Sequence, residues 1–260
     1  AAMFRLGNVD EEIHAGYEIL QKYHKTVTFF GSARISEDNE YYQKAKDLAF
    51  QLAKAGYTII TGGGGGIMEA ANRGAIEAGG QSIGFNIRLP HEQSLNKYTT
   101  DSFAFTHFAP RKIVMTLLAD AYVCFPGGFG TMDEICEIIT LTQTKKMTPV
   151  PIVLFDQKFW HKWDEFVCES ILPNKLITDG DEKIYTITED ITEVVDLIKN
   201  RAIVWHDETQ GATFDVVDIP EDMKADVAKY RAQLIEEVAG YDEGLLEKFM
   251  EDENSITEEE

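Results

Sequence analysis

Short apolar runs alternate with amphipathic segments along the first 200 residues of this sequence. The apolar runs are rich in Val, Ile, Thr and Phe, which is typical of buried strands. The amphipathic segments carry apolar residues at helical spacing, as Ile13, Tyr17 and Leu20 do. Because strand and helix alternate, the pattern predicts an α/β fold, a doubly wound, Rossmann-like parallel sheet with helices on both faces.

The predicted elements follow one another closely. Strands are expected at residues 26–30, 57–61, 82–87, 102–105, 120–125, 151–155 and 184–187. Helices are expected at residues 10–24, 41–55, 67–78, 110–119, 132–142, 159–172 and 189–199. In the helix 159–172, we interpret the aromatic stripe of Trp160, Trp163 and Phe166 as core packing.

The pattern changes near residue 201. Residues 202–205 and 212–217 alternate like two paired strands, and residues 220–238 carry the apolar stripe of a long helix. We therefore expect three parts: an N-terminal helix in residues 1–25, a main α/β domain in residues 26–200, and a small acidic α+β appendage in residues 201–260.

The net charge of −21 is concentrated at the C-terminal end, where residues 201–260 carry −13 of it. Such an acidic chain is a poor partner for nucleic acid, whose phosphates attract Lys and Arg. No apolar run is long enough to span a membrane, and the start of the sequence lacks a signal-peptide pattern. Cys124 and Cys136 fall in predicted core elements, which suggests buried thiols in a reducing compartment. We expect a cytoplasmic protein that binds neither nucleic acid nor membranes.

The candidate site centres on residues 125–134, which read F-P-G-G-F-G-T-M-D-E. This stretch follows a predicted strand and leads into a predicted helix, with three glycines in the turn between them. Glycines let backbone N–H groups approach a ligand closely, and a helix N-terminus adds its positive dipole end. Thr131 is expected as the helix N-cap, with Glu134 completing a capping box. The stretch predicts an anion site suited to phosphate, and a glycine turn without a ligand is the simpler alternative.

A second glycine turn, residues 62–66, also follows a predicted strand and precedes a helix. Neither turn fits the dinucleotide fingerprint G-x-G-x-x-G, and the sequence has no G-x-x-x-x-G-K-[ST] motif. Both observations disfavour NAD and a P-loop nucleotide. In a doubly wound sheet, both turns would lie at the carboxyl edge of the strands, where ligands bind.

Arg111 and Lys112 lie in the first turn of a predicted helix, where cations oppose the helix dipole, so structure alone does not favour them there. An arginine can fork onto phosphate oxygens, and a lysine acts as a point charge. Glu134 lies one turn into its helix, where a carboxylate could stabilise an oxocarbenium-like centre or activate water. A surface salt bridge for Arg111 and helix capping for Glu134 are the structural alternatives.

These residues resemble those of a known family. Residues 126–134 (P-G-G-F-G-T-M-D-E) are similar to the P-G-G-x-G-T-x-x-E motif of the LOG ("lonely guy") family. Its members are cytokinin riboside 5′-monophosphate phosphoribohydrolases and bacterial relatives that act on AMP, often mislabelled lysine decarboxylases. Arg111 and Lys112 match that family's upstream Arg-Lys pair. Residues 62–71 resemble its G-G-G-x-G-x-M-E-A stretch, residues 30–34 its F-G-S-A-R strand end, and the resemblance covers residues 25–197.

The resemblance implies hydrolysis of the N-glycosidic bond of a purine nucleoside 5′-monophosphate, either AMP or an N6-substituted AMP as in cytokinin biosynthesis. It implies that Arg111 and Glu134 are catalytic, and that the protein is a homodimer with no metal and no cofactor. The residues implied to bind the substrate are Glu92, Lys112, Gly127, Gly128, Phe129, Gly130, Thr131 and Thr140, with Gly31, Ser32, Gly63 and Gly64 in the turns for the phosphate.

Residues 194–260 resemble a different protein, part of the insert in the GTPase domain of translation elongation factor G. They include R-A-I-V-W-H-D-E-T-Q-G-A-T-F-D-V-V-D-I-P-E-D-M. The GTPase motifs are absent, so GTP hydrolysis is not implied. The resemblance implies a contact with the ribosomal stalk protein, and the sequence leaves open whether a fusion of the two parts is natural or engineered.

Three other functions stay open. One is a non-catalytic nucleotide-binding or molybdenum-cofactor-binding protein on the same fold. Another is a pyridoxal phosphate-dependent decarboxylase, which needs a Schiff-base lysine, and no lysine stands out. The third treats the C-terminal acidic helices as an interaction module, although a solvated charged face is the commoner explanation of such segments.

Overall fold

The computed structural model describes residues 8–88, 94–117, 119–199, 203–205 and 214–216. The chain divides into two compact units, residues 1–199 and residues 200–260. A seven-stranded sheet lies in the first unit and a two-stranded sheet in the second. No helix in these described ranges is both long and apolar enough to cross a membrane.

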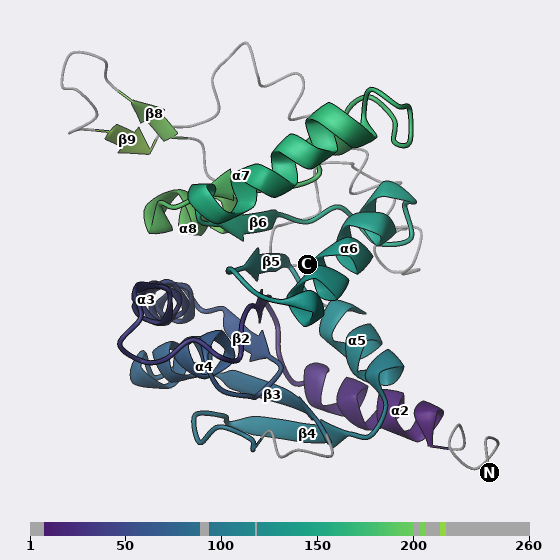
Figure 1. Ribbon diagram of the computed structural model, residues 1–260. Coiled ribbons are helices and arrows are strands. Elements are labelled where there is room, and N and C mark those ends of the chain that lie inside the picture. The colour runs from purple at the N-terminus through teal and green to yellow at the C-terminus, as the bar shows by residue number, and fades with distance from the viewer. Residues whose placement is uncertain (1–7, 89–93, 118, 200–202, 206–213, 217–260) are drawn as a thin grey trace, which may run out of the picture. The chain divides into compact units, whose positions relative to one another are not determined.

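The first unit alternates strands and helices, as Figure 1 shows. Its strands are β1 (Thr26–Phe30), β2 (Thr58–Thr61), β3 (Ser82–Ile87), β4 (Asp101–Phe105), β5 (Ala121–Cys124), β6 (Ile152–Phe155) and β7 (Thr186–Thr188). Its α-helices are α2 (Val9–Leu20), α3 (Glu40–Lys54), α4 (Ile67–Glu77), α5 (Phe108–Leu117), α6 (Phe129–Gln143), α7 (Gln157–Phe166) and α8 (Ile191–Lys199). A π-helix, η1 (Val167–Ile171), continues α7, and a short 3-10 helix, η2 (Asp181–Lys183), precedes β7.

The seven strands are all parallel, in the order β4-β3-β2-β1-β5-β6-β7. The chain winds outward from β1 to β4 in one direction and from β5 to β7 in the other. The two directions meet between β1 and β5, where Val27 is paired with Ala121 and Phe30 with Cys124. In open parallel sheets, ligands bind at this kind of switch point, outside the carboxyl ends of the strands.

Burial explains why these segments are strands. Every residue of β1, β2, β3, β5 and β6 is buried, because helices cover both faces, and a doubly covered strand reads as a continuous apolar run. The edge strands β4 and β7 are only partly buried. The predicted doubly wound parallel sheet is therefore confirmed.

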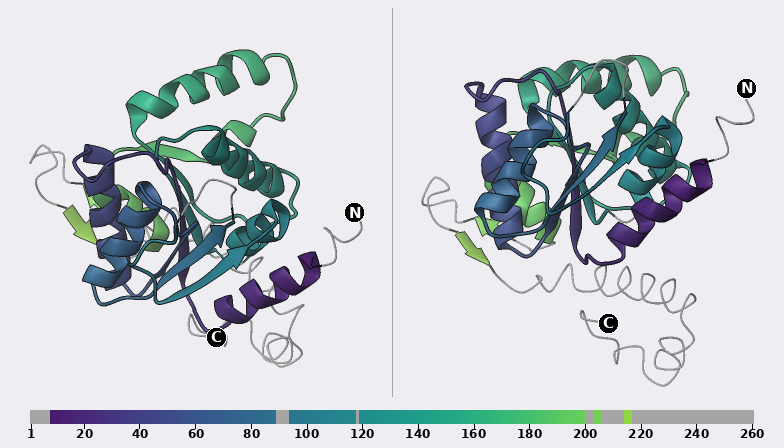
Figure 2. Two further views of the ribbon diagram at one scale, coloured as in Figure 1. Left: turned by 60° about the horizontal axis from the view of Figure 1, so that its bottom comes forward. Right: turned by 90° about the horizontal axis from the view of Figure 1, so that it is seen from below.

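The helices form two layers, one on each face of the sheet (Figure 2). One core packs α3, α4 and α8 against the sheet through residues such as Leu48, Ala71 and Val195. The other core packs α2, α5, α6 and α7, with Met115 and Trp160 among its buried side chains.

Two predictions about burial are wrong. Phe166 is half exposed, because α7 ends there and the chain continues as a π-helix. Of the aromatic stripe, Trp160 is fully buried, and its indole N–H donates to the carbonyl oxygens of Cys124 and Phe155. Cys136 is exposed, since it lies on α6 away from the buried face, whereas Cys124 is buried as expected.

The second unit contains an antiparallel strand pair. Strand β8 (Ile203–Trp205) pairs with β9 (Phe214–Val216), and Ile203 lies opposite Val216. The pairing expected for residues 202–205 and 212–217 is confirmed in these described residues. The helix expected at residues 220–238 lies outside them.

Candidate functional site

A cavity of about 480 Å³ lies at the carboxyl ends of β1, β2, β3 and β5. Its walls come from the loops after β1, β2 and β5 and from the N-terminal parts of α4, α5 and α6. The lining residues are 29–34, 128–131, Gly62, Met68, Ile87, Phe108, Arg111 and Glu134. The two glycine turns that the sequence singled out therefore meet at one cavity, at the switch point of the sheet.

Backbone hydrogen bonds hold the loops of this cavity together. The Ser32 N–H donates to the Pro126 carbonyl oxygen over 3.1 Å, which ties the loop after β1 to the loop after β5. The Ile67 N–H donates to the Ser32 carbonyl oxygen over 3.0 Å, which ties the same loop to the start of α4. The loop after β1 is thus the common wall of both turns.

Helix α6 begins at Phe129 with Gly128 as its N-cap, and no side chain caps it. Its first backbone bond runs from the Met132 N–H to the Gly128 carbonyl oxygen over 3.0 Å. The N–H groups of Phe129, Gly130 and Thr131 therefore have no hydrogen-bond partner among the described residues. They indicate an anion-binding site, because unpaired N–H groups and the positive end of the helix dipole lie at the same place.

The predicted capping box is wrong. Thr131 lies inside the helix instead of capping it, because the helix starts two residues earlier. Its side chain is buried against Gly127, where an added Cβ would lie 2.1 Å from the Thr131 Oγ1. The side chain of Glu134 is consequently not used for capping.

Arg111 is buried, with 7% of its surface exposed, which rules out a surface salt bridge. Its Nε donates to the Phe85 carbonyl oxygen over 2.7 Å, and its Nη1 lies 3.6 Å from Oε1 of Glu134. Gly62 leaves the room that the guanidinium occupies, because an added Cβ there would lie 2.1 Å from the Arg111 Nη2. Burial lowers the pKa of Arg111 and the Glu134 charge opposes this.

Burial raises the pKa of Glu134 to about 7. The charge of Arg111 opposes this shift, and the neighbouring Asp133 adds to it. A carboxyl group with a pKa near neutral pH can both take up and release a proton under physiological conditions. Glu134 and Arg111, which the sequence placed 23 positions apart, form one pair of opposite charges in the cavity.

Lys112 does not line the cavity. Its Nζ lies 2.9 Å from Oδ2 of Asp133 and 2.9 Å from Oε2 of Glu137, so it bridges α5 to α6. Burial lowers the pKa of Lys112, but the hydrogen bonds to both carboxylates outweigh this and leave the pKa raised. The lysine expected to bind the substrate is thus engaged by two carboxylates.

The other predicted site residues fall into three groups. Gly31, Ser32, Gly128, Phe129, Gly130 and Thr131 line the cavity, whereas Gly63, Gly64, Gly127 and Thr140 do not. The Gly63 and Gly64 carbonyl oxygens accept hydrogen bonds from Asn96, and the Thr140 hydroxyl donates to the Cys136 carbonyl oxygen. Glu92 lies outside the described residues.

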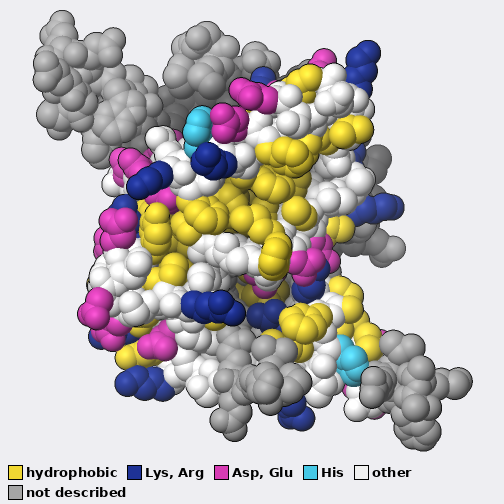
Figure 3. Space-filling view, viewed as in Figure 1, with side chains coloured by type: hydrophobic (Ala, Val, Ile, Leu, Met, Phe, Trp, Pro, Cys, Tyr) yellow, Lys and Arg dark blue, Asp and Glu magenta, His cyan; other side chains and the backbone are white. Residues whose placement is uncertain are grey.

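Eight lining residues were not predicted as site residues: Phe29, Phe30, Ala33, Arg34, Gly62, Met68, Ile87 and Phe108. Arg34 ends the F-G-S-A-R stretch and Gly62 opens the run of five glycines, so both had a sequence signal. Phe108 is half exposed, and Phe129 is 97% exposed. Hydrophobic side chains also gather across the face shown in Figure 3, with basic side chains beside them.

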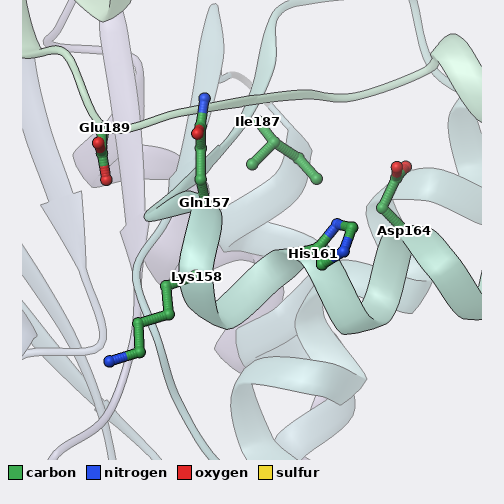
Figure 4. A pocket seen from close by; sticks show the side chains of 6 residues that line it. All are labelled: Gln157, Lys158, His161, Asp164, Ile187 and Glu189. Carbon is green, nitrogen blue, oxygen red and sulfur yellow. The ribbon is translucent and has the colours of Figure 1, made fainter.

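A second cavity, of about 560 Å³, lies on the α7 side of the sheet (Figure 4). It is lined by Gln157, Lys158, His161, Asp164, Ile187 and Glu189, and it shares no residue with the first. It contains neither a glycine turn nor an arginine. No group of His, Cys, Asp or Glu in the described part of the chain is arranged to hold a metal ion. The cavity with Arg111 and Glu134 is therefore the candidate site.

A family model described as "Possible lysine decarboxylase" matches residues 68–198, which is half of the chain and includes Arg111 and Glu134. This chain belongs to the LOG family. Among the residues that line the candidate site of this LOG protein there is no lysine, which a pyridoxal phosphate enzyme needs for its Schiff base.

Solved structures share the fold of this LOG protein. The X-ray structure of TM1055 is 25% identical, with a TM-score of 0.52, and the match covers 68% of this chain and 99% of that one. The molybdenum cofactor carrier protein from Chlamydomonas reinhardtii is 21% identical, with a TM-score of 0.50, covering 68% of this chain and 96% of that one. The second likeness shows the fold alone.

Curated relatives match a different stretch of the chain. Elongation factor G from Amoebophilus asiaticus is 60% identical over 67 residues, and that from Cytophaga hutchinsonii is 57% identical over 67 residues. These matches cover 26% of this chain and only 9% and 10% of the two elongation factors. The partial likeness to elongation factor G predicted from the sequence is confirmed.

Proposed function

We propose that this LOG-family protein hydrolyses the N-glycosidic bond of a purine nucleoside 5′-monophosphate, AMP or N6-substituted AMP. The products would be the free base and ribose 5-phosphate. The observation that carries the proposal is the pair of Glu134 and the buried Arg111 next to an uncapped helix N-terminus, inside one cavity.

Glu134 supplies the charge that such a reaction needs. When the bond from C1′ to the purine nitrogen breaks, positive charge develops on the sugar, and a nearby carboxylate stabilises it. Water then adds its hydroxyl to C1′, and its proton ends on the leaving base. A carboxyl group whose pKa is raised to about 7 by burial can also accept the proton of the attacking water.

The start of α6 and Arg111 would hold the rest of the nucleotide. Three N–H groups at residues 129–131 are free to donate to phosphate oxygens, and the helix dipole favours their negative charge. Arg111 is anchored by the Phe85 carbonyl oxygen and keeps Glu134 in place. The site is thus arranged before the substrate arrives, which favours the transition state.

The test is to incubate the protein with AMP and to measure free adenine and ribose 5-phosphate by chromatography, with Glu134→Gln in parallel. We expect adenine release by the parent, and a loss of about 10²–10⁴-fold in kcat/KM in the variant, typical for removal of an acid–base group. The kcat/KM of the parent should rise with pH through about 7, as Glu134 loses its proton.

A matched control is Glu189→Gln, the same exchange at an exposed carboxylate that lines only the separate cavity of Figure 4. This variant should keep most of the activity. If AMP binds to the parent but is never cleaved, the protein is a non-catalytic nucleotide-binding protein on the same fold. If activity survives in Glu134→Gln, another group performs the chemistry.

A further inference from the structure

A phosphate monoester carries between about −1.5 and −2 charges at neutral pH, so its site needs more than one cation. Near the start of α6, the sequence offered Arg111 and Lys112 for this role. Lys112 is held by the carboxylates of Asp133 and Glu137 at 2.9 Å each, so this cluster carries no excess positive charge. Arg111 faces the carboxyl group of Glu134. These groups alone leave a dianion poorly neutralised.

Arg34 is the other cation in the lining of the cavity. It is exposed, and its guanidinium has no hydrogen bond or ion pair with any residue of the described ranges. The backbone that carries it is fixed, because the Arg34 N–H donates to the Ser32 Oγ over 3.1 Å. The Ser32 N–H in turn donates to the Pro126 carbonyl oxygen, at the entrance to the α6 turn.

We propose that Arg34 binds the 5′-phosphate of the substrate together with the free N–H groups of α6, and that it makes the site prefer nucleotides to nucleosides. This inference rests on the function proposed above. The second cation that binds the phosphate is then Arg34, on the loop after β1, and not Lys112. Lys112 is then a positioning residue, which joins α5 to α6 and so keeps Arg111 and Glu134 at their distance.

The experiment compares Arg34→Gln with Lys158→Gln. Lys158 is also an exposed cation, but it lines the separate cavity of Figure 4, so both variants change the net charge equally. Losing a charge-assisted hydrogen bond should lower kcat/KM for AMP by about 10- to 100-fold in Arg34→Gln. The concentration of ribose 5-phosphate that gives half-maximal inhibition should be higher for Arg34→Gln than for the parent by a similar factor. Inhibition by adenine, which has no phosphate, should not change.

Lys158→Gln should stay within about twofold of the parent in all three measurements. Lys158 lines the separate cavity, and salt screens the interaction between exposed charges that are not in contact. If Arg34→Gln behaves like Lys158→Gln while the parent cleaves AMP, the inference is overturned and the proposed function stands. If the parent cleaves no nucleotide, the proposed function fails. Calorimetric titration with ribose 5-phosphate then decides on Arg34: binding that is lost in Arg34→Gln supports the inference, and equal or absent binding overturns it.

Discussion

The two glycine turns look alike in the sequence but differ in the structure. In the turn after β2, neighbouring atoms leave no room for a side chain at two positions: an added Cβ would lie 2.1 Å from Arg111 at Gly62 and 2.2 Å from the Ser32 carbonyl oxygen at Gly66. Gly66 also has a φ of +64°, a conformation that other residues rarely adopt. In the turn after β5, an added Cβ at Gly128 or Gly130 would meet nothing within 4 Å.

A buried polar network supports the first turn. Asn72 accepts hydrogen bonds from the Thr61 hydroxyl over 2.6 Å and from the Asn96 amide over 2.9 Å, and Asn96 also donates to the Gly64 carbonyl oxygen over 3.0 Å. The Gly63 N–H donates to the Thr61 hydroxyl over 2.9 Å. The first turn therefore uses glycine to pack against its own protein. The second leaves Gly128 and Gly130 facing open space, as a ligand site does, and only its Gly127 is packed, against Thr131.

Among the glycine substitutions that test this comparison, Gly62→Ala should have the largest effect. The new Cβ would overlap the guanidinium of Arg111 and the Met68 sulfur, which are the ends of flexible side chains, so the fold should survive. Overpacking of this kind costs about 1–3 kcal/mol of unfolding free energy. Displacing Arg111 by about an ångström should lower kcat/KM for AMP by about 100-fold. Urea denaturation and the AMP assay measure the two effects.

Gly65→Ala is the matched control in the same turn. Its Cβ would meet only the Ala33 carbonyl oxygen at 3.5 Å, an ordinary contact, and we expect nearly parental activity. Equal activity in Gly62→Ala and Gly65→Ala would contradict the packing role assigned to Gly62.

Glu134, one turn beyond the second glycine turn, should make stability depend on pH. Its folded pKa of about 7 lies above the ordinary value of 4.5, so between these pH values the unfolded chain has lost a proton that the folded protein keeps. The unfolding free energy therefore falls as pH rises through this window and stays lower above it, by up to roughly 3 kcal/mol. Glu134→Gln cannot ionise and lacks this fall.

Urea denaturation of the parent and of Glu134→Gln at pH 5 and pH 8 measures this effect. The variant should gain stability relative to the parent between the two pH values. If the unfolding free energies of variant and parent differ by the same amount at pH 5 and at pH 8, the pKa of Glu134 is not raised by burial.

The smallest expected effect is that of Gly130→Ala on stability. Gly130 lies in the first turn of α6 with open space around it, so alanine should leave the unfolding free energy unchanged or raise it by about 0.5–1 kcal/mol. The methyl group would enter the cavity lining, and KM for AMP should rise several-fold. A clear loss of stability would mean that this turn, like the first, is packed against its own protein.

The sequence predicted the fold well because the central strands are buried on both faces and read as continuous apolar runs. The start of α6 was missed because its N-cap, Gly128, uses no side chain, whereas Thr131 looked like a cap. Arg111 and Glu134 were chosen from the sequence, but their contact depends on how α5 packs beside α6. The same packing decides that Lys112 meets Asp133 and Glu137, which no spacing in the sequence reveals.

The anchoring of Arg111 has a consequence for folding. The side chain comes from α5, its Nε is held by the backbone of β3, its guanidinium lies over the turn after β2, and its charge partner comes from α6. These segments are distant in sequence, and contacts of that kind form late because their loops cost entropy to close. During refolding, we expect helical signal and apolar collapse to return before the proposed cleavage of AMP, so that recovery of this activity would report the completed native state.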